Sequence, residues 1–232
     1  MRVLVIVDAQ VDFVHGALGS MTAKSIIPHM RERAKGFADG NTLILLTKDT
    51  HDENYLNTLE GFYLPIEHCK DMTPGWSLVK EISTLTDGYS NFLIYSDEEV
   101  VRSRVLKNTF GSIKLCEILK KYEDDITDIT FMGFCTDICV VSNVLMARAY
   151  LPNTPITVDA SCCAGTTPDK HTAALEVMKS CQINVIYSGE LICLGFKPMI
   201  RTFIPVFVMP YMKSWTVIFW WREMFQFMTP QH

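Results

Sequence analysis

Short, continuous runs of apolar residues alternate along the chain with longer segments in which apolar residues recur every three or four positions. Uninterrupted runs rich in β-branched residues are typical of strands buried on both faces, and the longer spacing is typical of amphipathic helices. The pattern predicts strands over residues 2–8, 42–49, 91–96, 128–134, 155–161 and 183–188. It predicts helices over residues 22–38, 111–122, 137–150 and 167–181.

This alternation predicts the fold class. Strands that take turns with helices favour a mostly parallel central sheet covered by helices on both faces, which is a three-layer α/β/α architecture. No internal repeat or low-complexity linker interrupts the pattern before residue 189. Residues 49–80 form a long irregular segment, and in a compact domain such a segment is usually a functional loop.

Composition and charge narrow the function classes. The 232 residues carry a net charge of −5 without any block of Lys or Arg, which argues against a nucleic-acid or anionic-membrane surface. The apolar run at the N-terminus is broken by Asp8 and is too short for an export signal, so we expect a cytoplasmic protein. The eight cysteines are then reduced thiols, and because none forms a C-x-x-C pair, a zinc knuckle is not expected.

Reactive residues follow the ends of the predicted strands. Asp8 ends the first strand, Asp49 and His51 follow the second, and Cys135 and Cys139 follow the fourth. Lys107 follows the third strand after a loop. Because ligands bind beyond the carboxyl ends of strands in open α/β sheets, these side chains are expected at one edge.

Cys139 has two interpretations. At the first turn of a predicted helix, backbone N–H groups and the helix dipole would favour its thiolate, and Asp8 could accept its proton. A thiol, a base and N–H donors are the parts needed for acyl transfer through a thioester. Alternatively, Cys139 is a small core residue, as most buried free cysteines are.

The irregular segment contains candidate metal ligands. Asp49 and His51 stand two apart at a strand end, and Glu60 and His68 follow in the same loop. Imidazole and carboxylate ligands suit one divalent ion, Zn²⁺ first, with Fe²⁺ or Mn²⁺ as alternatives. The competing interpretation is a solvated loop.

Together these residues resemble the nicotinamidase/isochorismatase-like cysteine hydrolase family. The stretch "VIVDAQVDF" resembles its first-strand motif, "LKNTFGS" its lysine motif and "GFCTDICV" its nucleophile motif. The stretch "TKDTH…EG…LPIEHC…GW" resembles the metal loop of the nicotinamidase branch. The likeness covers residues 1–189, which it implies are one isochorismatase-like hydrolase domain.

The resemblance implies a role for each matched residue. Asp8 would be the catalytic base, Lys107 its cationic partner and Cys139 the nucleophile. The Phe134–Cys135 peptide bond would be cis, and the N–H groups of Cys135 and Cys139 would form the oxyanion hole. Metal ligands would be Asp49, His51 and His68 with Glu60, and Phe13 and Phe134 would contact the substrate.

The implied activity is metal-assisted hydrolysis of nicotinamide to nicotinate and ammonia through a thioester, within NAD metabolism and pyridine nucleotide salvage. We expect a small-molecule amide as substrate and a homo-oligomer. The alternatives are a hydrolase of another small amide or N-carbamoyl compound and a non-catalytic binding module. Nicotinamidases usually hold an aromatic residue three positions before the last metal histidine, where this chain has Pro65.

Residues 190–232 are a separate, apolar and aromatic-rich C-terminal extension. A membrane-spanning helix needs about 20 largely apolar residues, and Pro205, Pro210 and Lys213 argue against one here. An interfacial anchor, a subunit-contact arm and a non-native end remain as interpretations. We favour a segment that covers a subunit or lies on a membrane surface.

Overall fold

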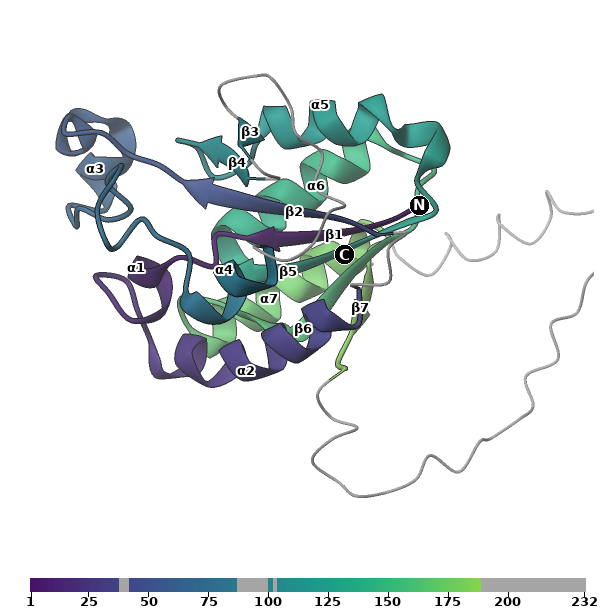
Figure 1. Ribbon diagram of the computed structural model, residues 1–232, viewed down its shortest axis with the longest axis horizontal. Coiled ribbons are helices and arrows are strands. Elements are labelled where there is room, and N and C mark those ends of the chain that lie inside the picture. The colour runs from purple at the N-terminus through teal and green to yellow at the C-terminus, as the bar shows by residue number, and fades with distance from the viewer. Residues whose placement is uncertain (38–41, 87–99, 102–103, 189–232) are drawn as a thin grey trace, which may run out of the picture. The chain divides into compact units, whose positions relative to one another are not determined.

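The computed structural model describes residues 1–37, 42–86, 100–101 and 104–188 (Figure 1). The strand expected at 91–96 and the extension at 190–232 lie outside the described residues. The expected domain boundary after residue 189 stays a prediction.

A seven-stranded sheet forms the centre of the domain, in the order β3-β4-β2-β1-β5-β6-β7. Its strands are β1 (Arg2–Val7), β2 (Thr42–Asp49), β3 (Val100–Val101), β4 (Arg104–Lys107), β5 (Asp128–Phe134), β6 (Ile156–Ala164) and β7 (Asn184–Ile186). All neighbouring strands run parallel except the antiparallel pair β3 and β4. The mostly parallel sheet expected from the apolar runs is thereby confirmed.

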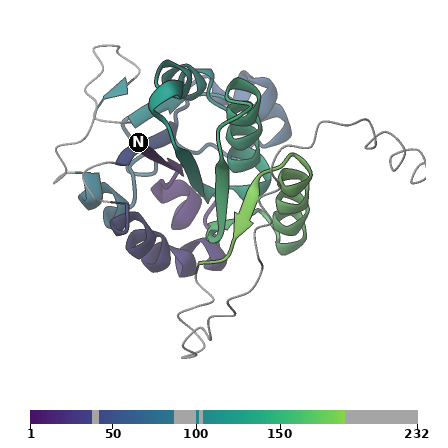
Figure 2. The same cartoon turned by 90° about the vertical axis from the view of Figure 1, so that its right-hand side faces the viewer.

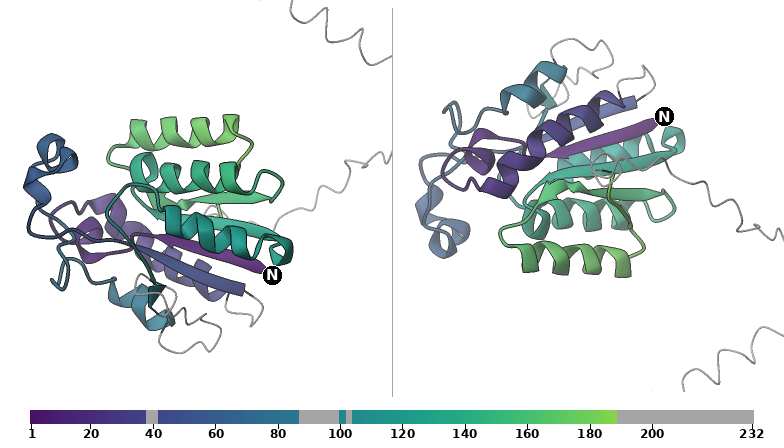
Figure 3. Two further views of the ribbon diagram at one scale, coloured as in Figure 1. Left: turned by 90° about the horizontal axis from the view of Figure 1, so that it is seen from above. Right: turned by 90° about the horizontal axis from the view of Figure 1, so that it is seen from below.

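Helices cover both faces of the sheet. The α-helices of the described residues are α1 (Val11–Val14), α2 (Met21–Lys35), α3 (Leu59–Tyr63), α4 (Lys80–Thr86), α5 (Ile113–Lys121), α6 (Val141–Tyr150) and α7 (Pro168–Ser180). Helices α2 and α4 lie on one face, and α5, α6 and α7 lie on the other (Figure 3). In Figure 2 the amino ends of the strands face the viewer, and α2 and α7 lie on opposite sides of the sheet. This is the expected three-layer α/β/α fold.

Side-chain caps explain where three helices begin. The hydroxyls of Ser20, Ser112 and Thr167 each accept a hydrogen bond from the backbone N–H three residues later. Such caps satisfy donors that the first turn of a helix leaves unpaired. None of the helices within the described ranges is both long and apolar enough to cross a bilayer.

The carboxyl ends of the parallel strands face the same side of the domain, where α1 and α3 also lie (Figure 1). Lys107 belongs to this edge because it is the last residue of β4 and pairs with Asp49 of β2. The apolar pattern did not predict β4 itself. The four-residue strand β4 is too short for an apolar run to reveal.

The chain changes conformation after β5. A five-residue π-type turn, Thr136–Val140, precedes α6, where a regular helix from residue 137 was expected. Gly133 makes the approach to this turn possible. Its φ is +136°, and a Cβ at this position would lie 2.1 Å from the Val7 carbonyl oxygen. Only glycine allows β5 to pass β1 this closely.

Candidate active site

Asp8 stands directly after β1 and is completely buried. Its φ of +48° is uncommon for a residue with a side chain, and such backbone conformations concentrate at functional sites. The Thr47 hydroxyl donates to Oδ1 over 2.6 Å, and the Thr47 carbonyl accepts from the Asp8 N–H. Strand β2 thus fixes the orientation of this carboxylate.

Lys107 connects three other reactive side chains. Its Nζ lies 2.8 Å from Asp8 Oδ2, 3.3 Å from Asp49 Oδ1 and 3.6 Å from Cys139 Sγ. The side chain is only 2% exposed, so these partners replace nearly all of its hydration. Burial alone would lower the pKa of Lys107, but its anionic neighbours raise the pKa well above its usual value. The amine is therefore an ammonium.

Cys139 lies in the turn after β5, and 4% of its surface is exposed. Burial raises the pKa of Cys139 well above its usual value, although the Lys107 ammonium opposes this shift. The resting group is a thiol, so a thiolate forms only when a base takes the proton. Burial likewise raises the pKa of Asp8 against the influence of Lys107, which makes the carboxylate a stronger base.

The Phe134–Cys135 peptide bond is cis, as the resemblance implied. The Cys135 carbonyl accepts hydrogen bonds from the N–H groups of Ile138 and Val140, at 3.1 and 3.0 Å. These contacts close the turn on itself. All seven cysteines within the described residues are free thiols.

A second cluster lies beside the first. Ligand atoms of Asp49, His51, Glu60 and His68 all lie within 4.8 Å of one another. Asp49 Oδ2 is 3.0 Å from His51 Nε2 and 3.4 Å from His68 Nε2. Glu60 Oε1 lies 3.8 Å from each of the same two nitrogens. The end of β2 and the segment that follows it therefore bring all four predicted ligands together.

These residues fit one divalent ion. The His68 Nδ1–H donates to the Ile66 carbonyl over 2.8 Å, which leaves the Nε2 lone pair directed at the cluster. This is the outer hydrogen bond that metal-binding histidines usually make. Without metal, the histidines can instead carry protons on Nε2 and donate to Asp49. Burial raises the pKa of Asp49, but these hydrogen bonds outweigh the effect of burial, so the pKa falls below its usual value. An ionised carboxylate and two imidazoles are ligands that Zn²⁺ prefers.

A cleft of about 1110 Å³ opens over both clusters. Cys139 and the four candidate metal ligands line it, together with Phe13, Phe134 and Tyr55. The Phe13 ring meets the edge of His68 at 5.6 Å between centroids. Both predicted aromatic substrate contacts thus line the cleft, whereas Pro65 is exposed and does not.

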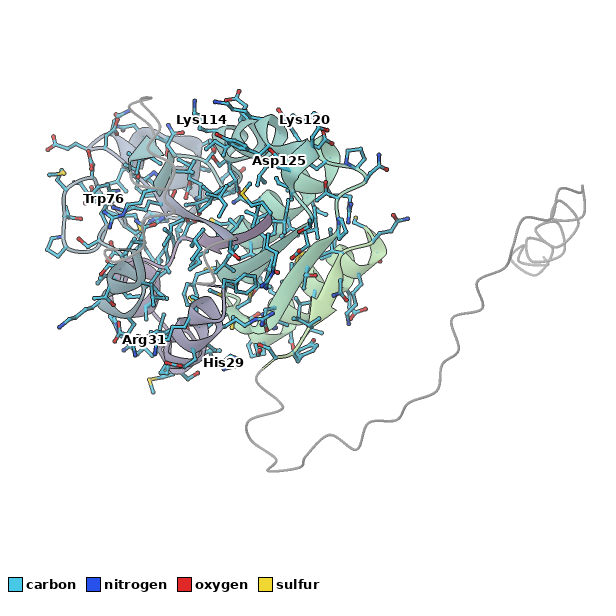
Figure 4. All side chains as sticks on the ribbon, turned by 45° about the vertical axis from the view of Figure 1, so that its right-hand side comes forward. His29, Arg31, Trp76, Lys114, Lys120 and Asp125 are labelled. Carbon is cyan, nitrogen blue, oxygen red and sulfur yellow. The ribbon has the colours of Figure 1, made fainter. Side chains whose placement is uncertain are left out.

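Sequence reasoning missed several supporting residues. Gln10 Nε2 donates to the carbonyls of Asp49 and Trp76, and its Oε1 accepts from the Asp49 N–H over 2.7 Å. Figure 4 labels Trp76 at the left of the molecule. Lys120 in α5 and Asp125 shortly after it lie near the top of the same view. Tyr55 packs against both histidines, with centroids 4.6 Å from His51 and 5.1 Å from His68. The sequence feature that could have identified Gln10 is its position inside the first-strand motif.

Comparison with known proteins agrees with this geometry. The family model described as the isochorismatase domain matches residues 2–190. A nicotinamidase of Schizosaccharomyces pombe is 27% identical over 220 residues, covering 79% of this chain and 91% of that protein.

Solved structures of similar fold include two amidases. The nicotinamidase of Bacillus subtilis has a TM-score of 0.65 at 23% identity, covering 80% of this chain and 98% of that one. The pyrazinamidase of Pyrococcus horikoshii, solved in complex with zinc, has a TM-score of 0.62 at 25% identity, with the same two coverages.

Proposed function

The chain belongs to the isochorismatase family, and we propose that it is a metal-assisted cysteine amidohydrolase that converts nicotinamide into nicotinate and ammonia. One observation carries the proposal: the Lys107 ammonium lies within 3.6 Å of Asp8, Asp49 and Cys139. A buried base, a cation and a thiol at one point are the parts of a nucleophilic site. A binding module would have no need to bury them together.

In the proposed reaction, Asp8 takes the Cys139 proton and Sγ attacks the amide carbon. The N–H groups of Cys135 and Cys139 would hold the developing oxyanion, and each such donor is worth about 2.7–4 kcal/mol in comparable sites. Asp8 then gives its proton to the leaving nitrogen, the C–N bond breaks and ammonia departs.

The second half of the reaction releases the acid. Asp8 takes a proton from water, which attacks the thioester carbon. The C–S bond breaks, and Asp8 returns the proton to the Cys139 sulfur. Throughout the cycle Lys107 stabilises the negative charge that moves between Asp8 and Cys139, which is why its raised pKa matters.

Asp49, His51, Glu60 and His68 would hold the metal ion, with zinc as the best match to their donor atoms. When bound, such an ion supplies a Lewis acid that orients the substrate's ring nitrogen or a water molecule. Phe13 and Phe134 would contact the two sides of a flat ring entering the cleft. We further propose that the protein is a homo-oligomer and that it is located in the cytoplasm.

A second candidate is hydrolysis of another small amide or N-carbamoyl compound. It is favoured by Pro65, which stands where nicotinamidases usually hold an aromatic residue. This side chain is exposed and does not line the cleft, so it gives a substrate ring no stacking surface. We therefore expect weaker discrimination among aromatic and small aliphatic amides.

Ammonia release from a panel of amides tests the proposal. The purified protein should hydrolyse nicotinamide, lose the activity after treatment with a chelator and regain it when zinc is added. His68→Gln, which removes one ligand outside the Asp8–Lys107–Cys139 cluster, should be inactive and should not respond to zinc. Turnover of N-carbamoyl compounds with nicotinamide inert would overturn the substrate assignment.

A further inference from the structure

Two side-chain contacts attach the turn that carries Cys139 to the segment that follows β6. The Thr136 hydroxyl lies 2.8 Å from Nδ1 of His171, which belongs to α7. The Asp137 carboxylate accepts from the N–H and the hydroxyl of Thr166, at 2.8 and 2.5 Å.

The contact between Thr136 and His171 is the inner one of the two. Thr136 is completely buried and His171 is half-buried, whereas Thr166 is exposed. Gly165 shows how closely the segments pack, because a Cβ there would lie 2.8 Å from Asp137 Oδ1 and 2.9 Å from His171 Cβ. The start of α7 thus braces the turn with little space between them.

The direction of the hydrogen bond depends on which ring nitrogen of the neutral imidazole carries the proton. Burial lowers the pKa of His171, although Asp137 opposes the shift. With the proton on Nε2, the ring accepts at Nδ1 from the Thr136 hydroxyl. With the proton on Nδ1, the ring donates to the hydroxyl oxygen, so the two side chains are paired in either tautomer. A buried hydroxyl that lost this partner would remain unsatisfied.

Thr136 is bonded to the residue that supplies one proposed oxyanion donor. The Cys135 carbonyl is already held by the N–H groups of Ile138 and Val140. The Thr136 side chain adds a second point of attachment to the Cys135–Thr136 peptide, which adjoins the Phe134–Cys135 peptide that carries the proposed donor. His171 itself is absent from the described residues that line the cleft, so it acts through Thr136 and does not touch substrate.

We infer that His171 is a positioning residue: through the Thr136 hydroxyl it holds the turn so that the Cys135 and Cys139 N–H groups face the oxyanion. This inference rests on the proposed function of the same site. A misplaced oxyanion hole weakens stabilisation of the transition state more than binding of the ground state. Loss of this hydrogen bond should therefore lower kcat and leave KM nearly unchanged.

Single and double variants test the link. His171→Ala and Thr136→Val should each lower kcat about five- to tenfold, the effect of one lost hydrogen bond, with KM changed less than about twofold. The double variant should be no slower than either single variant, because both remove the same contact. His171→Asn and Thr136→Ser should recover most of the rate, since each keeps the acceptor or the hydroxyl. Thr172→Ala, at an exposed position on α7, is the matched control.

Alkylation of Cys139 by iodoacetamide gives a readout that needs no turnover. Peptide mass mapping separates Cys139 from Cys135. Because the thiol is only 4% exposed, loosening the turn should raise its alkylation rate in either single variant, with no further rise in the double.

The outcomes separate the two proposals. If the wild type releases no ammonia from any amide, the proposed function fails, and alkylation still decides the role of His171. Multiplicative effects of His171→Ala and Thr136→Val on kcat or alkylation would overturn the inference, as would variants that behave like the wild type.

Discussion

Asp49 Oδ1 lies 3.3 Å from Lys107 Nζ, and this contact joins the two halves of the site. The other oxygen, Oδ2, faces His51 and His68 at 3.0 and 3.4 Å. One buried carboxylate therefore serves both the thiol cluster and the metal cluster. A change at Asp49 must perturb both halves, so variants of the histidines isolate the metal better.

Cys139→Ala should abolish turnover and leave the fold intact. Removing the nucleophile of a hydrolase costs on the order of 10⁶ in kcat. Cys135→Ala is the matched control, because the proposed role of Cys135 is carried by its backbone, and we expect it to keep most of the activity. Mass spectrometry during turnover should detect an acyl adduct on Cys139. An adduct on Cys135, or turnover by Cys139→Ala, would contradict the assignment.

Asp8→Asn should lower kcat by about 10²–10⁴, which is the usual contribution of a general base. Thr47→Val provides the comparison, since it removes the hydroxyl that donates to Oδ1 but keeps the carboxylate. Its effect should be far smaller than that of Asp8→Asn. Steady-state kinetics measures kcat for both variants. Equal losses of kcat would show that the role of Asp8 depends on its orientation and not on proton transfer.

Zinc should stabilise the folded protein. A ligand present at a hundred times its Kd adds about 2.7 kcal/mol to the free energy of unfolding. At about 2–4 °C per kcal/mol for a domain of this size, Tm should rise by about 5–11 °C. Thermal unfolding with a zinc buffer and with a chelator measures the shift. His51→Ala should abolish it, and an unchanged shift in that variant would exclude His51 as a ligand.

Stability should depend on pH in opposite ways without and with metal. In the metal-free protein, burial lowers the pKa of His68, but Asp49, the Ile66 carbonyl and Glu60 outweigh it and raise the pKa above 6.5. A group whose pKa is raised by folding contributes stability that is complete below its unfolded pKa. That contribution is lost as pH rises through the folded pKa.

We therefore expect the metal-free urea midpoint to fall as pH rises above about 6.5, and the slope to flatten in His68→Gln. The added stability from zinc should instead grow with pH, because the imidazoles bind metal only when deprotonated. Urea titrations with chelator and with zinc, each at several pH values, check both signs. A metal-free midpoint that rises through the same interval in wild type but not in His68→Gln would contradict the assignment.

Local patterns were enough to predict most of the sheet. Strand β1 is recognisable because Val3, Leu4, Val5 and Val7 are completely buried, so every position must be apolar. Strand β4 cannot be recognised in this way, because it has only four residues and its positions alternate between half-buried and buried. For the same reason Lys107 could be assigned to the site only through its motif and the strand-end rule.

The supporting contacts depend on the tertiary structure. Thr47 and Asp8 are 39 positions apart, and Thr136 and His171 are 35 apart, so no local pattern relates them. The candidate metal ligands were predictable as a group because all four fall in one segment of the sequence, residues 49–68. Their partners Gln10 and Tyr55 were not, since an amide and an aromatic ring have many other uses.

Gly133→Ala should destabilise the fold more than any exposed glycine substitution. Gly133 pairs with Val7 at the point where β5 meets β1, and its φ of +136° strains any residue with a Cβ. The Cβ would also lie 2.1 Å from the Val7 carbonyl oxygen, which is rigid backbone. Backbone strain of about 1–3 kcal/mol and overpacking of about 1–3 kcal/mol together predict a loss of about 2–6 kcal/mol.

Gly36→Ala is the matched control for Gly133→Ala. Gly36 has a φ of −65°, and its nearest contact would be the Arg33 carbonyl oxygen at 3.3 Å, so its change in stability should stay within about 1 kcal/mol. Urea unfolding of both variants measures the difference. The fraction of Gly133→Ala that folds should also be slow in turnover, because moving β5 displaces Cys135, two residues later. Equal midpoints for the two variants would show that β5 can move away from β1 without cost, and that the position of the turn does not depend on this contact.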